Sequence, residues 1–501
     1  MSVLDNITRS KDYIGQGPLQ SRKSIVEHQI RSILVALLSI AIAIGIGVTV
    51  SLFSTVNILY FAVSLFVGVI LMFFYRTEVS LSIIIVWIAI QNTVIPILYY
   101  IIHSTSNSIW TILLSTSQAT VLSIVILYLL KQMMIGRRPS VWSLVIIFLS
   151  VSVLASAIIH RDSSLFTAIN SARGLLVPVL YVWLGRTVGM TGISQRRIIK
   201  VMAYVTFVGA ILAILDALVV PTSLWTSIDI SKYWLEVKHV PASEVGVLPG
   251  NFFENYGGSI LRRAVSIYGD PLAAGYSMAF GFAATLITME YEIRKYWYVV
   301  MLIIIVAGIA LTFTRAAYII VVIEFLAFSL YRRSSGKPLS KLYFFAMLAI
   351  FIFIARKVLT STLGGTNGSL MIHLHAIDAI PVLIKHPMGF GVGSLGGPEG
   401  AYLQIWWQYG IVVLGLFGLF LWVTYKRLLS VEVRLHRIMV MGVFWAIIVT
   451  GFISQEMQTD TASSIAWIII GMGWCERSNL VEKRELMVMR DLKDQRYFLR
   501  S

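Results

Sequence analysis

Apolar residues run along the chain in blocks of roughly 20, the length at which an α-helix spans the hydrocarbon core of a bilayer. Short polar segments separate most of these blocks. The pattern predicts an all-α, polytopic integral membrane protein of about fourteen transmembrane helices. The expected spans are residues 33–53, 57–75, 80–102, 109–131, 141–159, 165–189, 198–220, 270–290, 296–314, 316–331, 341–356, 404–426, 437–455 and 460–475. Around them we expect a cytoplasmic basic arm at 1–31, a transmembrane domain at 32–475 and a cytoplasmic tail at 476–501.

Composition and charge agree with a membrane protein and exclude a soluble fold. Hydrophobic residues make up 57% of the chain and charged residues 13%, so a soluble fold could not bury the apolar surface. The net charge of +16 would suggest nucleic acid as a partner of a soluble protein, but most Lys and Arg residues fall in alternate connections. That distribution places both termini in the cytoplasm and makes membrane lipids, not nucleic acid, the partner of the basic residues. The single cysteine, Cys475, leaves no intramolecular disulfide.

Two extracytoplasmic connections, residues 221–269 and 357–403, run to about 50 residues each, and loops of that length are usually functional. In the second loop, apolar residues at helical spacing predict a helix on the membrane surface over 369–385, kinked at Pro381. A glycine-rich stretch follows, with Gly389, Gly391 and Gly393, whose flexible backbone brings amide N–H groups close to an anion. The same pattern is also typical of a mobile connection.

One arginine, Arg173, lies deep within a predicted span and not near its end. Arg173 falls in the sixth span, where a cation is costly unless it faces a polar cavity or an acidic partner. Asp216 of the seventh span and Glu324 of the tenth are the candidate partners for an internal ion pair. The alternative is a functional role for Arg173 in the binding of an anion.

Three further arginines are expected on the extracytoplasmic side, in a protein whose basic residues otherwise lie mostly on the cytoplasmic side. Residues 296–331 supply two spans, so the turn at residues 312–315 must be tight and must hold Arg315 at the outer face. Arg262 and Arg263 end the first long loop. Guanidinium groups bind phosphate oxygens bidentately. The set indicates a site for a phosphorylated, lipid-linked substrate, although Arg315 alone would also fit a side chain that snorkels to lipid phosphates.

The order and spacing of several motifs resemble the O-antigen ligase and O-antigen polymerase superfamily of bacterial envelope glycosyltransferases. The resemblance covers roughly residues 165–430. It rests on the segments Arg173-Gly-Leu-Leu-Val-Pro178, Arg263 to Pro271, Thr312-Phe-Thr-Arg315, His386-Pro-x-Gly-x-Gly-x-Gly393 and Glu399-Gly-Ala-Tyr402 with Gln408-Tyr-Gly410. The ligases carry a His-Asn pair where this chain has Glu399-Gly400, and this difference favours the polymerase side of the family.

The resemblance implies a metal-independent, inverting transfer of a saccharide from a polyprenyl diphosphate to an acceptor hydroxyl, outside the bacterial plasma (inner) membrane. Glu399 is the candidate catalytic base, with His373, His375 and His386 as rivals. The candidate diphosphate ligands are Arg263 and Arg315, with Arg173 deeper and Arg262 peripheral, and Gly389, Gly391 and Gly393 are expected near the donor. No metal cluster and no cofactor are expected. The expected partners are polyprenyl-diphosphate-linked oligosaccharides, with a chain-length regulator and a flippase as further candidates.

Two other functions fit the same pattern. A ligase would share the donor site but move a finished glycan to a different acceptor. A transporter or flippase of lipid-linked saccharides would also use many helices and buried charges. The sequence contains no inverted repeat of the kind that many transporters show, and the long outer loops favour chemistry at one face.

Overall fold

The computed structural model describes most of the chain from Thr77 onward. The described residues are 77–102, 141–163, 165–190, 195–236, 248–256, 259–292, 295–334, 376, 378–394, 397–431 and 434–473. The predicted spans at 33–53, 57–75, 109–131 and 341–356 lie outside them, as do the arm at 1–31 and the tail at 476–501.

The described part of the chain is mostly helical, as the apolar pattern predicts. The long helices are α4 (Thr77–Ile102), α7 (Val141–Ile159), α8 (Leu165–Met190), α9 (Gln195–Leu218), α12 (Pro271–Tyr291), α13 (Lys295–Thr312), α14 (Arg315–Ser334), α18 (Ala401–Leu429), α19 (Arg434–Gly451) and α20 (Asp460–Met472). Each coincides within a few residues with a predicted span. By length and composition, 4 of them, α9, α12, α13 and α18, are long and apolar enough to cross a membrane, and shorter apolar helices accompany them.

Helix α12 lies at the centre of the bundle. Of its most apolar stretch, 94% is buried inside the protein, and it packs against α9, α13, α14 and α20. Small residues permit this close packing. A side chain at Gly281 would collide with Thr206 of α9, and one at Gly275 would meet the side chain of Thr314 at 2.5 Å. The sequence of α12 therefore sets how closely its neighbours approach.

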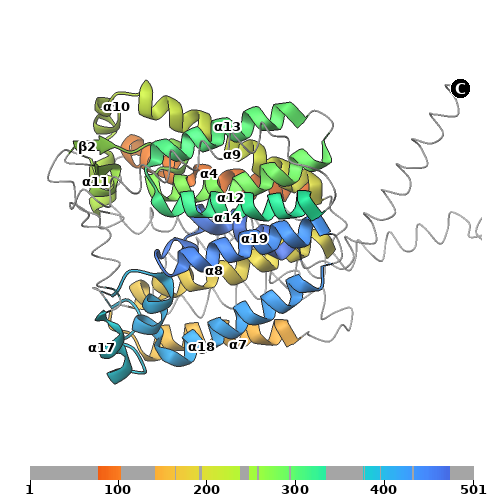
Figure 1. Ribbon diagram of the computed structural model, residues 1–501. Helices are drawn as coiled ribbons and strands as arrows, with labels where there is room; N and C mark the ends of the chain where they lie inside the picture. The colour runs from red at the N-terminus through yellow and green to blue at the C-terminus, as the bar shows by residue number, and fades with distance from the viewer. Residues whose placement is uncertain are drawn as a thin grey trace, which may run out of the picture.

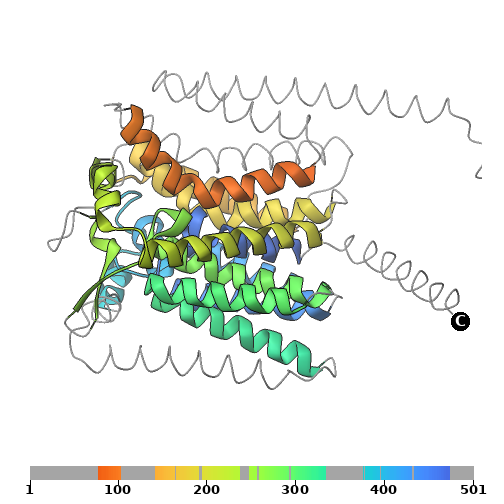
Figure 2. The ribbon, with the colours of Figure 1, turned by 90° about the horizontal axis from the view of Figure 1, so that it is seen from above.

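The bundle has two distinct ends (Figures 1 and 2). One, which we call the hairpin end, carries the short elements α10 (Thr222–Ser227), α11 (Ile230–Glu236), β1 (Phe253–Tyr256), β2 (Ser259–Arg262), α17 (Ile380–Lys385) and the 3₁₀ turn η3 (Glu456–Gln458). The other, which we call the basic end, carries Arg196 at the start of α9, Lys295 at the start of α13 and Arg332 near the end of α14. The segregation of basic residues agrees with the charge pattern of the sequence.

The first long loop contains a β-hairpin that the all-α prediction missed. Strands β1 and β2 pair antiparallel, with Phe253 opposite Arg262 and Glu254 opposite Leu261. Between α9 and the hairpin, α10 and α11 fold into a small core in which Tyr233 and Trp234 pack with Phe252 and Ile95. The loop is thus a folded cap on the hairpin end of the bundle.

The second long loop contains a short helix at the expected proline. Helix α17 begins at Ile380, with Pro381 in its first turn, where proline is tolerated because the N–H groups there lack helical partners. Ala376 and Asp378 before it are also helical and Ala379 lies in a turn, so the helical path is interrupted just before Pro381. Residues 369–375 lie outside the described part of the chain.

Glu324 lies within α14 and is completely buried, with 0% of its surface exposed. Among the described residues, neither of its carboxyl oxygens has a hydrogen-bond partner. Burying a charged carboxylate without a partner is costly. Glutamine has the same shape and no charge, so Glu324→Gln should keep or raise the melting temperature of the protein in detergent.

Glu290 provides the matched control. Its carboxylate lies 2.9 Å from Arg332 and 4.0 Å from Lys295. Glu290→Gln should lower the melting temperature by several degrees, because the guanidinium then loses its ionic partner. A larger loss at Glu324 than at Glu290 would contradict the unpaired state of Glu324.

Candidate functional site

The tight turn expected at residues 312–315 is present. Helix α13 ends at Thr312 and α14 begins at Arg315. Phe313 adopts a positive φ of 52°, a conformation that residues with a side chain rarely use and that the surrounding structure must hold in place. The Thr312 hydroxyl helps to do so, because it donates to the Ile309 carbonyl at 2.8 Å and accepts from the Thr314 N–H at 3.3 Å.

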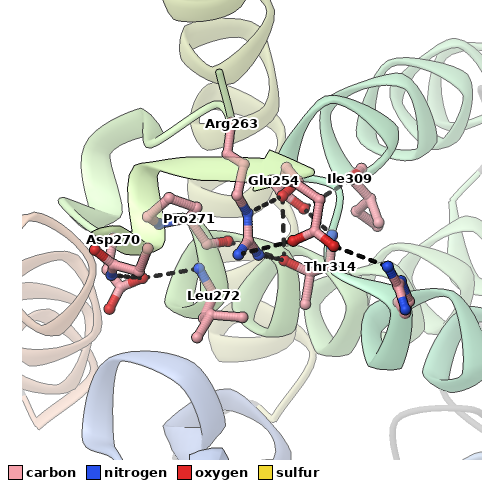
Figure 3. A network of polar contacts seen from close by, with 10 residues as sticks. Glu254, Arg263, Asp270, Pro271, Leu272, Ile309 and Thr314 are labelled. Atoms are coloured by element: carbon pink, nitrogen blue, oxygen red, sulfur yellow. Dashed lines mark hydrogen bonds and ion pairs between the residues drawn. The ribbon is translucent and has the colours of Figure 1, made fainter. Parts of the chain in front are cut away.

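Arg263 packs its guanidinium against this turn (Figure 3). Its Nε donates to the Thr312 carbonyl at 2.8 Å, and its Nη2 donates to the Thr314 hydroxyl at 3.0 Å. The Glu254 carboxylate lies 3.7 Å from Nη1. Burial lowers the pKa of Arg263 from its ordinary value and the Glu254 carboxylate opposes that effect. Because arginine titrates far above neutral pH, Arg263 is a buried cation under ordinary conditions.

Glu254 also joins Arg263 to Arg315. Its second carboxyl oxygen accepts from Arg315 Nη2 at 2.9 Å. The side chains become more exposed along this series, from 7% for Arg263 to 19% for Glu254 and 29% for Arg315. We call Glu254, Arg263, Thr312, Thr314 and Arg315 the arginine cluster. It holds two guanidiniums and one carboxylate, the Asp270 carboxylate also acts on Arg263 from nearby, and Arg315 is the most accessible member of the cluster.

The neighbouring Arg262 belongs to a different group. It forms an ion pair with Asp216 near the end of α9, and its Nη1 donates to the Val220 carbonyl at 2.7 Å. Asp216 also accepts from the Trp225 indole at 2.8 Å and from the Val265 N–H at 2.7 Å. Asp216, one of the two candidate partners for Arg173, is therefore paired with Arg262. Through these bonds Asp216 ties α9 to the first loop.

Arg173 and Glu399 both lie beside η3. Arg173 is half-buried in α8, and the next residue, Gly174, approaches the backbone of Gln458. Glu399 is exposed and comes just before α18. The Gln458 side chain donates to the Ala401 carbonyl at 3.4 Å, at the first residue of α18. We call this region the η3 junction. Helix α12 packs against both η3 and the turn before β1, so the junction and the arginine cluster share the hairpin end.

The glycine-rich stretch is a fixed structure that packs against α18. Gly389, Gly391 and Gly393 all have positive φ, between 76° and 107°, which explains why glycine occupies these positions. The Gly389 N–H donates to the His386 carbonyl at 2.9 Å, and the Phe390 N–H to the Trp407 carbonyl at 2.7 Å. These two amides serve the folding of the loop, so an anion would have to displace those carbonyls to bind them.

The histidine candidates do not join either group in the described structure. His386 is exposed, and its ring lies 4.7 Å from that of Phe390, which stacks on Trp407 at 4.1 Å. His373 and His375 lie outside the described residues. Among the residues that the structure describes, no group of 3 or more His, Cys, Asp or Glu side chains is placed to hold a metal ion.

Glu254 is the residue that sequence reasoning missed. It lies eight positions before Arg262 in a loop with several acidic residues, and no periodicity distinguishes it from the others. Only the hairpin brings it beside Arg263, and only the α13–α14 turn brings Arg315 to its other side. A carboxylate in the same loop as an arginine pair was the one available signal.

Comparisons with known proteins do not assign the chain to a family. A scan against protein-family models and a search of the curated proteins each found no match. The arginine cluster and the η3 junction are therefore the features from which a function is inferred.

Thr314 tests how the cluster is held. Its hydroxyl accepts from Arg263 and donates to the Pro271 carbonyl at 3.1 Å. Thr314→Val should lower the free energy of unfolding by about 1–3 kcal/mol, because a buried guanidinium N–H loses its acceptor. Thermal unfolding in detergent measures this. Thr226→Val, which removes an exposed hydroxyl in α10, is the control and should change stability by less than about 0.5 kcal/mol. Equal effects would contradict the role of Thr314.

Proposed function

We propose that the protein is a bacterial cell-surface polysaccharide polymerase, a metal-independent, inverting glycosyltransferase that joins polyprenyl-diphosphate-linked oligosaccharide repeat units outside the plasma membrane. The arginine cluster is the observation that carries the proposal. The motif resemblance supports the same reaction, because the turn at Thr312–Arg315 and the Arg263 segment are two of its elements.

The donor diphosphate suits the arginine cluster by charge and by geometry. A diphosphate presents several oxygens, and guanidinium groups bind such oxygens in pairs. Arg315 is accessible and now shares Glu254 with Arg263. In the proposed complex the diphosphate takes the place of the Glu254 carboxylate at Arg315, while Arg263 stays bonded to the turn and adds its charge from behind. Arg315 is thus the proposed phosphate ligand and Arg263 its positioning residue.

The proposed reaction is a single displacement. The acceptor hydroxyl oxygen attacks the anomeric carbon as its bond to the diphosphate oxygen breaks, and the configuration at that carbon inverts. The hydroxyl proton passes to a base, and the diphosphate leaves with the bonding electrons. Positive groups placed where this charge develops lower the barrier. Glu399 is the proposed base, because it is exposed beside the η3 junction at the same end of the bundle as Arg315.

Arg173 has a secondary place in this proposal. It lies in α8 next to Gly174, which approaches Gln458 of the η3 junction. A half-buried cation in this place suits an anionic group that enters from the membrane. Arg262 is bound to Asp216 and is proposed only to support the hairpin.

Arg315→Ala tests the diphosphate assignment. Purified protein with polyprenyl-diphosphate oligosaccharide should form polymer, and the variant should lose at least about 100-fold of the rate, because the leaving group loses its accessible cation. Arg197→Ala, an exposed arginine at the basic end, is the control and should leave the rate unchanged. Chain length is read by gel electrophoresis. A normal polymer ladder from a folded Arg315→Ala protein would exclude Arg315 as a phosphate ligand.

Glu399→Gln tests the base. It should reduce kcat by about 10²–10⁴-fold and change KM only a few-fold, because the amide keeps the shape but cannot accept the proton. Asp378→Asn, an exposed acid of the same loop, is the control with unchanged kcat. An unchanged kcat in Glu399→Gln would remove this residue from the reaction.

The same assay separates the alternatives. Transfer of an intact long chain to a different acceptor, without chain growth, would indicate a ligase. In liposomes, movement of the labelled lipid between leaflets without new glycosidic bonds would indicate a transporter and would overturn the proposal.

A further inference from the structure

A cavity of about 180 Å³ lies at the basic end, remote from the arginine cluster. Its walls are Arg196 and Ile199 from the first turns of α9 and Thr288, Tyr291 and Glu292 from the end of α12. None of these residues has a place in the proposed reaction. The cavity combines a cation, a hydroxyl and an aromatic ring between two helices.

The cation in this cavity is held in position. The guanidinium carbon of Arg196 lies 4.3 Å from the centroid of the Tyr291 ring, within the range of a cation–π contact. The Tyr291 hydroxyl in turn lies 2.9 Å from Nε2 of His436, which fixes the ring against α19. A guanidinium placed over a fixed ring loses less conformational freedom when it binds a ligand. Arg196 is therefore partly organised for binding.

The charged walls of the cavity are Arg196 and Glu292, one of each sign. Glu292 is paired with Lys200, which lies beside the cavity with its Nζ 2.7 Å from the carboxylate. With Lys200 included, the charged groups in and beside the cavity are two cations and one anion. Thr288 already donates its hydroxyl proton to the Ala284 carbonyl, so the charged groups dominate recognition. The expected ligand carries a negative charge.

The residues beside the cavity indicate what kind of ligand carries this negative charge. Helix α13 starts beside it with Tyr296 and Trp297, which are 77% and 44% exposed, and the Trp297 ring lies 5.8 Å from that of Phe207 in α9. Exposed Tyr and Trp residues next to a lysine, here Lys295, are typical of the level of lipid headgroups. Basic pockets between membrane helices at this level suit phosphate headgroups.

We propose that this cavity binds the phosphate of an anionic lipid headgroup, with Arg196 as the main ligand and Lys200 as a second cation. The lipid acyl chains lie along the apolar outer surface of α9 and α13, where Tyr204, Val208 and Ile303 are exposed. The bound lipid links α9, α12 and α13 at the basic end. The site does not rest on the proposed polymerase activity.

The test measures the melting temperature of the full-length protein in neutral detergent as phosphatidylglycerol is added. Wild-type protein should gain several degrees with a saturable dependence on lipid, because binding to the folded state stabilises it. Phosphatidylcholine should give less than half of that gain. Arg196→Gln should weaken the apparent affinity for phosphatidylglycerol at least 10-fold. Arg197→Gln, which removes the same charge from an exposed neighbour outside the cavity, should keep the wild-type affinity.

A second variant covers the case in which Arg196→Gln fails to fold. Ile199→Phe fills the cavity without any change of charge and should also reduce the affinity for phosphatidylglycerol. Inorganic phosphate is tested in parallel. An equal gain from inorganic phosphate, or equal losses in Arg196→Gln and Arg197→Gln, would overturn the proposal of a headgroup site.

Discussion

The hairpin end depends on the burial of one guanidinium, that of Arg263. A cation at the edge of a membrane bundle is stable only where its hydrogen bonds and its charge are satisfied. The structure satisfies them from two separate segments: the Thr312 carbonyl and Thr314 hydroxyl of one turn, and the Glu254 carboxylate of the hairpin. The β-hairpin is thereby tied to the turn between α13 and α14. Because α14 begins at that turn, the position of Arg315 follows from the same set of contacts.

This arrangement accounts for the strained residue beside it. Phe313 holds a positive φ so that two helices reverse direction within two residues and leave the Thr312 carbonyl free for Arg263. Strain of this kind persists only where neighbouring contacts stabilise it, and it is frequent at functional sites. The close packing of this turn against α12 also depends on Gly275, which leaves space for the Thr314 side chain. The helix core and the arginine cluster are therefore parts of one packed unit.

The charged residues at the two ends of the bundle have different surroundings. At the hairpin end, Arg263 and Arg315 share the Glu254 carboxylate, and Arg262 pairs with Asp216. At the basic end, cations lie near the ends of the helices. The start of α9 and the end of α12 enclose a cavity at the expected level of the lipid headgroups. The first arrangement suits a diphosphate that arrives as a substrate. The second suits a lipid that remains as part of the assembly.

Much of the helical framework follows from the sequence alone. The helices coincide with apolar blocks, and the lack of spare residues between 296 and 331 was enough to predict the turn that places Arg315. Residue types also singled out Arg263 as a candidate phosphate ligand. These features are local, because length and hydropathy act within one segment of chain. The family resemblance extended the same reasoning to the expected reaction.

Only the tertiary structure decided which charges meet. Arg262 and Arg263 are adjacent in sequence, yet Arg262 ends β2 and pairs with Asp216, whereas Arg263 follows the strand and contacts Glu254. Asp216 was one of two candidate partners for Arg173, and Glu254 was not singled out at all. An ion pair depends on the distance between side chains that folding brings together, and many pairings satisfy the same list of charges. The sequence by itself determined the helices and the residue types, whereas the hairpin and the α13–α14 turn decided their partners.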